Sequence, residues 1–187
     1  MTEIVVPGAG LVYMKVGTHA NEPFDQIFER KRKEIEDEGF AFWGYGGNTC
    51  HPLSMVQPFA QGIHEQGGII RLVMQPMTSR HFTVSARAEE YSADALNWTA
   101  VPRGINVLGS RYALKVSNLR EEAFELPLSQ TRVAIGPTTG RRGDRYIKGH
   151  VDKACLEVTD AVPEEDETAV AIQLVADLVE PYAVFVR

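Results

Sequence analysis

The chain has 187 residues, 44% hydrophobic and 24% charged, which predicts one ordinary globular domain large enough to bury a core. Its net charge of -6 argues against sequence-blind duplex binding, because such binding depends on many phosphate contacts. No run approaches the ~18 apolar residues of a membrane span, and no basic-then-apolar signal opens the sequence. We therefore expect a cytoplasmic protein that does not enter a membrane.

The cysteines and histidines predict neither a disulfide framework nor a metal centre. Cys50 and Cys155 are far apart in sequence and match no zinc pattern, so both are expected to be reduced in the cytoplasm. The five histidines lack spacing of the HExxH kind. The sequence therefore predicts no metal site and no cofactor.

The first third of the chain predicts a strand followed by two helices. Residues 11–16 (LVYMKV) are typical of a strand that ends at Gly17. Helical spacing over 23–38 follows, with Asn21 as the expected N-cap and Gly39 as the expected C-cap. The charged residues of this helix, Glu34 among them, are expected to form a solvated, self-pairing face. A second helix is expected over about 53–66, where Pro58 predicts either a kink or a start at Gln57.

Extended stretches dominate the rest of the chain. Strands are expected at 69–74 (IIRLVM), 82–88 (FTVSARA), from 105, at 112–116 before a turn at Asn118, at 131–135 and at 146–158. Acidic residues 164–167 predict a surface linker. Residues 168–179 are expected to dock as a helix or strand, and 182–186 to form a closing strand. We predict one domain over 1–160, with the acidic linker and docked segment over 161–187.

The segment 40–51 (FAFWGYGGNTCH) combines aromatic rings, three glycines, a thiol and an imidazole just before a helix. Glycine lets the backbone approach a ligand closely, and the N–H groups that open a helix point outward from it. The sequence therefore predicts the main binding site here. The expected ligand-binding residues of this segment are Trp43, Tyr45, Gly46, Gly47 and Asn48, and Trp98 supplies a further ring that could stack.

A second candidate site is basic. Between Arg132 and Lys153 positive residues outnumber negative ones, although the whole chain is acidic. Arg141, Arg142 and Arg145 lie in and beside the polar loop 138–144, where guanidinium groups could bind phosphate oxygens in pairs. If a base and its phosphate are held together, this loop and the aromatic loop must converge in the fold.

The order of elements predicts an α+β fold, with a curved, mixed, largely antiparallel sheet or barrel and two helices from the N-terminal half. This order resembles the PUA-like superfamily, in particular its EVE and YTH-type domains. The similar pieces are LVYMKV, the helix at 24–38, Trp43-Gly44, the helix at 55–66, and the pair IIRLVM and FTVSARA. The resemblance covers about residues 11 to 158. It implies a pocket between helix and barrel that binds a nucleobase or nucleotide, or a modified base within nucleic acid.

Two other classes of function remain open from the sequence. One is a hydrolase acting on a modified nucleoside or nucleotide, for which Cys50, His51 and His19 are the candidate catalytic residues. Because adjacent residues on a helix do not face each other, a Cys50 pair would use His19 or His64 rather than His51. The other is an acidic protein-interaction or inhibitor protein.

Overall fold

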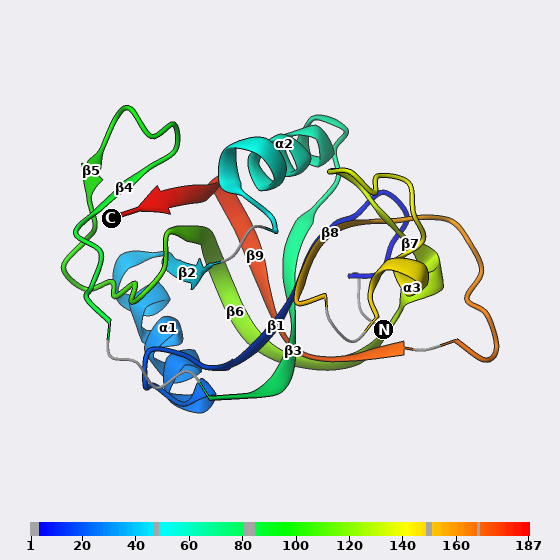
Figure 1. Ribbon diagram of the computed structural model, residues 1–187, viewed down its shortest axis with the longest axis horizontal. Helices are drawn as coiled ribbons and strands as arrows, with labels where there is room; N and C mark the ends of the chain where they lie inside the picture. The colour runs from blue at the N-terminus through cyan, green and yellow to red at the C-terminus, as the bar shows by residue number, and fades with distance from the viewer. Residues whose placement is uncertain (1–3, 47–48, 81–84, 149–150, 168) are drawn as a thin grey trace.

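A nine-stranded mixed sheet with two main helices gives the chain an α+β fold (Figure 1). The computed structural model describes residues 4–46, 49–80, 85–148, 151–167 and 169–187. Its elements in chain order are β1 (Gly10–Thr18), α1 (Phe24–Glu38), β2 (Ala41–Tyr45), a π-helical turn (Pro52–Val56), α2 (Gln57–Glu65), β3 (Ile70–Arg80), β4 (Glu90–Ser92), β5 (Thr99–Ala100), β6 (Tyr112–Pro127), a 3₁₀ turn (Leu128–Gln130), β7 (Thr131–Val133), α3 (Gly143–Tyr146), β8 (Lys153–Val158) and β9 (Ala169–Val186).

The sheet is mixed because one pair of strands is parallel and the others are antiparallel. β1 and β3 run parallel, and α1, β2 and α2 form the long connection that a parallel pair needs. The strand order is β2-β6-β9-β3-β1-β8-β7, with the β4–β5 hairpin attached to β9. The predicted α+β class and the mixed, largely antiparallel sheet are therefore confirmed.

Both predicted helices are present with nearly the expected bounds. α1 ends where Gly39 adopts a left-handed φ of 84°, and the N–H of Gly39 donates to the carbonyl of Ile35 at 2.9 Å. The expected N-cap at Asn21 is wrong, because Asn21 lies in a tight turn and no side chain caps α1. α2 begins at Gln57, so Pro58 occupies its first turn, where a proline needs no hydrogen-bonded N–H.

β1 is buried on both faces of the sheet, which explains its nearly continuous apolar sequence. Val12, Met14 and Val16 pack into the core that contains α1 and α2. Leu11 and Tyr13 point the other way, into a second core that includes residues of β7, β8 and the α3 region. A third, smaller core lies under the segment that contains Val101, Ile105 and Val107.

Several strand predictions are wrong in detail. Residues 85–88 form no strand and make only an isolated bridge between Arg87 and Leu108, while 82–84 lie outside the described residues. No strand covers 105–107. β6 continues through Asn118, whose left-handed φ of 47° coincides with a shift in register against β9 rather than with a turn. The strand expected over 146–158 is divided between the end of α3 and β8.

The C-terminal stretch docks as a single long strand at the centre of the sheet. β9 pairs with β6 along most of its length, with β3 over Leu174–Asp177, and with β4 near Val186. The acidic segment before it returns to the body of the protein, where a carboxylate oxygen of Glu167 accepts the N–H of Ser129 at 2.9 Å. Figure 1 shows β9 crossing the middle of the molecule, between the end that carries α1 and β2 and the end that carries α3 and β7.

Candidate functional site

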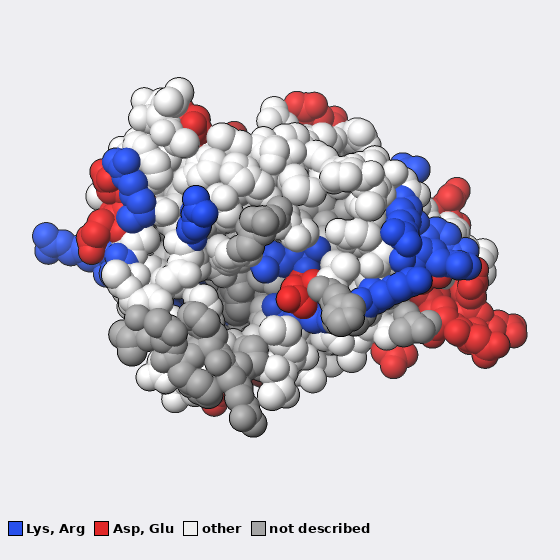
Figure 2. Space-filling model, in the orientation of Figure 1, with Lys and Arg blue, Asp and Glu red and all other residues white. Residues whose placement is uncertain are grey.

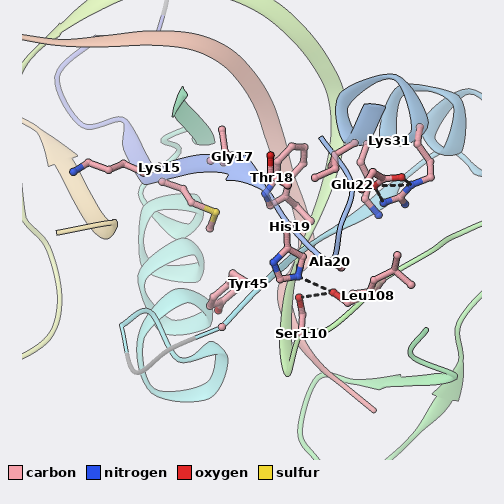
Figure 3. A pocket seen from close by; sticks show the side chains of 18 of the residues that line it. Lys15, Gly17, Thr18, His19, Ala20, Glu22, Lys31, Tyr45, Leu108 and Ser110 are labelled. Carbon is pink, nitrogen blue, oxygen red and sulfur yellow. Dashed lines mark hydrogen bonds and ion pairs between the residues drawn. The ribbon is translucent and has the colours of Figure 1, made fainter. Parts of the chain in front are cut away.

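A cavity of about 320 Å³ lies between the end of β1, α1 and β2 (Figure 3). Its walls also include the segment from Asn106 to Ser110, Met77 of β3 and Lys153 of β8. A volume of this size falls at the lower end of the range for small-molecule sites. The consecutive elements β1, α1 and β2 therefore build one candidate binding site together with three parts from later in the chain.

β2 supplies the aromatic wall of this cavity. Trp43, Tyr45 and Gly46 line it, as the sequence analysis expected for a binding site in this segment. Gly44 lets the opposite wall come close, because a Cβ there would lie 2.9 Å from Cβ of Ser110 and 3.1 Å from Cγ1 of Val107. The glycine therefore serves close packing of β2 on the facing segment.

The side chain of Trp43 is largely buried, but its indole N–H makes no hydrogen bond with the residues that the structure describes. Trp43 is only 5% exposed, and within the described ranges its Nε1 donates to no acceptor. Among the described residues, Nε1 of Trp43 is not one of the buried polar atoms that lack a partner, so it keeps some accessible surface. Since Trp43 lines the cavity, a bound ligand or solvent there is what can supply the missing acceptor.

His19 fixes the far wall of the cavity against the end of β1. Its Nε2 donates to the carbonyl of Leu108 at 2.9 Å, and the hydroxyl of Ser110 donates to the same oxygen at 3.3 Å (Figure 3). The turn that follows His19 closes through a bridge between His19 and Glu22, with Ala20 at a left-handed φ of 49°. Of the three catalytic candidates, only His19 lines the cavity.

A buried charge network holds the segment after Asn106 onto α1. Glu34, only 3% exposed, accepts from Lys31 at 2.9 Å, from Arg30 at 2.7 Å and from the backbone N–H of Asn106 at 3.0 Å. Arg30 also makes a paired contact with Glu22, whose closest distance is 2.6 Å, and donates to the carbonyl of Asn106. Burial lowers the pKa of Lys31 to about 8.

The sequence analysis missed this network because it placed Glu34 on a solvated face. The signal was present in the spacing: Ile27, Lys31 and Glu34 are four and three residues apart, so they share one face of α1. A lysine within an apolar stripe, with a glutamate three residues later, indicates a buried pair.

Two lysines of neighbouring strands also line the cavity. Lys15 is on β1, and its Nζ lies 3.9 Å from a carboxylate oxygen of Asp152, whose side chain is 53% exposed. Lys153 begins β8 opposite Met14. Within the part of the chain that the structure describes, Lys153 forms no ion pair. The sequence analysis counted Lys153 as part of the basic region but did not place it at a binding site.

Cys50 and His51 lie outside the cavity lining. Cys50 is 1% exposed, and its Sγ is 3.6 Å from Sγ of Cys155. Both cysteines are free, and the hydroxyl of Tyr45 donates to the carbonyl of Cys50. The hydrogen bond to Cys50 and burial raise the pKa of Cys155 well above its usual value. His51 instead packs against Tyr112 and Phe185, with ring centroids 4.8 and 5.2 Å away.

The arginine loop does not meet the aromatic loop, so the expected convergence is wrong. Figure 1 shows α3 and β7 at the opposite end of the molecule from β2, and none of the three arginines lines the cavity. Arg142 pairs with Asp144 and with Glu164, each at 2.8 Å, and Arg145 lies 3.6 Å from Asp144. Figure 2 shows this basic area beside a group of acidic residues.

Trp98, a further predicted ligand-binding residue, is not brought to the cavity either. Trp98 lies between β4 and β5, where the guanidinium of Arg187 stacks 3.8 Å from the centroid of its ring. Trp98 is absent from the cavity walls. Gly47 and Asn48 lie outside the described residues.

Among the described residues, no three His, Cys, Asp or Glu side chains are grouped so that they could hold a metal ion. No helix in the described ranges is long and apolar enough to cross a bilayer. Comparisons with family models, with curated proteins and with solved structures find no match for this chain.

Proposed function

We propose that the protein is a binding module that holds a nucleobase or nucleotide, including a modified base within nucleic acid, in the cavity beside Trp43. The observation that carries the proposal is that Trp43 lines a ligand-sized cavity, and that its indole N–H, which is not fully buried, has no hydrogen-bond partner among the described residues. A planar heterocycle can stack on an aromatic ring and accept a hydrogen bond, so it suits such a wall.

The position of the cavity gives further support. It lies between α1 and the sheet, which is where the resemblance to PUA-like domains would place the ligand. The order β1-α1-β2-α2-β3 also agrees with that resemblance. We therefore extend the proposal to the fold: a PUA-like domain with its ligand between helix and sheet.

Tryptophan fluorescence tests the proposal directly, because the chain has only two tryptophans. In a Trp98→Phe background, Trp43 is the only indole, and titration with nucleosides, 5′-mononucleotides and short oligonucleotides containing modified bases should change its emission. Measured by calorimetry, Trp43→Ala should weaken binding by roughly 1–3 kcal/mol through lost stacking. Trp98→Ala is the matched control and should bind normally.

The absence of any emission change across this panel at millimolar ligand would contradict the proposal. The hydrolase alternative would have to use His19, because Cys50 and His51 do not line the cavity. Mass spectrometry of the same mixtures after prolonged incubation separates the two functions: a binder returns each compound unchanged, whereas a hydrolase yields a product whose formation His19→Ala abolishes.

A further inference from the structure

Some polar groups of the cavity already form hydrogen bonds or ion pairs with other residues, and others do not do so among the described residues. The carbonyl of Leu108 accepts from both His19 and Ser110. The carboxylate of Glu22 is occupied by the guanidinium of Arg30. The acceptors of this wall therefore already have donors, and a ligand gains little by offering further donors to them.

The side-chain donors include two without partners in the described residues. Arg30 and Lys31 both donate to the carbonyl of Asn106. Their charges are also balanced, because Arg30 pairs with Glu22 and Lys31 with Glu34. By contrast, within the described ranges the indole N–H of Trp43 has no acceptor and the ammonium of Lys153 forms no ion pair. A ligand that satisfies both must bring a hydrogen-bond acceptor and a negative charge.

The two donors belong to different walls. Trp43 is on β2, which pairs with β6, whereas Lys153 opens β8 and pairs with β1. β1 extends to Thr18, beyond its pairing with β8, and residues Lys15 to Thr18 line the same cavity as Trp43 and Lys153. One ligand can therefore contact Trp43 with one part and Lys153 with another.

We infer that the ligand of this cavity is an anionic heterocycle of the nucleoside-phosphate class, with a ring acceptor on the N–H of Trp43 and the phosphate on Lys153. This inference builds on the proposed function and specifies its ligand class. The phosphate contact is thereby placed not on the arginine loop, where the guanidinium groups of Arg142 and Arg145 face acidic partners, but on Lys153, which lines the cavity and has no ion pair among the described residues. Lys15, on the neighbouring strand, adds to the positive potential.

The test compares nucleosides with their 5′-monophosphates by calorimetry. Wild-type protein should bind monophosphates about 10- to 100-fold more tightly, because a hydrogen bond to a charged group is among the stronger ones. Lys153→Gln should remove that preference. Lys148→Gln is the matched control, because Lys148 is exposed and does not line the cavity.

A second variant separates stacking from hydrogen bonding. Trp43→Phe keeps an aromatic ring but loses the N–H, and it should weaken binding of the same monophosphate about 2- to 10-fold. Circular dichroism and thermal unfolding of each variant verify that the fold is retained. A Trp43→Phe protein that is folded and binds as tightly as wild type would overturn the assignment of the N–H.

Short single strands of the same base then distinguish the source of the phosphate. A free nucleotide site should bind monophosphate and single strand within about tenfold, whereas a nucleic-acid site should favour the strand, with a salt slope that Lys153→Gln reduces by about one. Equal affinity for nucleoside and monophosphate, with Trp43→Ala still impaired, would overturn this inference and leave the proposed function standing. Failure of every compound to bind would instead overturn the proposed function.

Discussion

The two basic regions of the molecule differ in how their cations are paired with carboxylates. At the α3 end, Arg142 and Arg145 are on the surface and face Asp144, with Glu164 contacting Arg142 as well. At the cavity end, Arg30 and Lys31 are likewise balanced, but Lys153 has no carboxylate within the described part of the chain. The comparison teaches that the number of cations in a segment says little about how many are available. The positions of the carboxylates decide it.

The largest effect is expected when the buried carboxylate of Glu34, which holds the cavity wall, is removed. Glu34→Gln removes the negative charge that Arg30 and Lys31 share. Because this leaves buried positive charge without that partner, the free energy of unfolding should fall by about 3–5 kcal/mol. Urea denaturation measures this loss.

The matched control for Glu34 is Asp37→Asn on the same helix, where Asp37 pairs with Lys33 and both side chains are more than half exposed. Its effect should lie within the error of the measurement. A Glu34→Gln protein that unfolds as late in urea as the Asp37→Asn protein would show that the network does not hold the wall.

Stability at alkaline pH should distinguish Lys31 from Lys33, because Lys31 is buried and Lys33 is not. Burial lowers the pKa of Lys31 from 10.5 to about 8, so between these values the unfolded chain binds more protons than the folded one. The free energy of unfolding should therefore rise between about pH 8 and 10, by up to about 3 kcal/mol. Urea denaturation across this range measures the rise.

Lys31→Met should flatten this profile, while Lys33→Met should retain it. The free energy of unfolding should stop rising near pH 10, because burial raises the pKa of Tyr13 to about 12. Above pH 10 the unfolded chain releases the tyrosine proton before the folded one does, so stability then falls. A wild-type profile that is flat or declining from pH 8 to 10 would contradict the assignment to Lys31.

The smallest effect is expected at the arginine loop. Arg142→Ala with Arg145→Ala removes two surface cations that are paired with acidic neighbours, so affinity for nucleotides should stay within about twofold of wild type. Calorimetry measures the nucleotide affinity of this double variant and of Lys153→Gln under the same conditions. A loss in the double variant as large as that in Lys153→Gln would return the phosphate contact to the arginines.

The sequence predicted those parts of the fold that depend on local periodicity. α1 and α2 have helical spacing with proline or glycine near their ends, and β1 and β3 are short apolar runs, so all four were found near their true positions. β9 was harder to assign, because a stretch that is apolar on both faces is compatible with a helix or a strand. Its partners β6 and β3 are more than 40 residues away in sequence, and local patterns do not reveal such pairing.

The candidate site was predicted in part for a similar reason. Trp43, Tyr45 and Gly46 are contiguous, so one segment was enough to predict that they lie together. The rest of the wall comes from Lys153 and from the segment between Asn106 and Ser110, which only the strand order brings to β2. The arginine loop was wrongly expected at the same place, because the edge on which β7 lies cannot be derived from its own residues.

The central position of β9 has a consequence for how the protein is made. Ribosomes release the chain from its N-terminus at about 5–20 residues per second, so β1, β3 and β6 emerge several seconds before β9 does. Until then, the β6 and β3 edges that β9 will pair with are open, and an open edge can pair with another chain. The nascent protein should therefore depend on chaperone protection during synthesis, and its yield in cells should fall steeply as the rate of translation initiation rises.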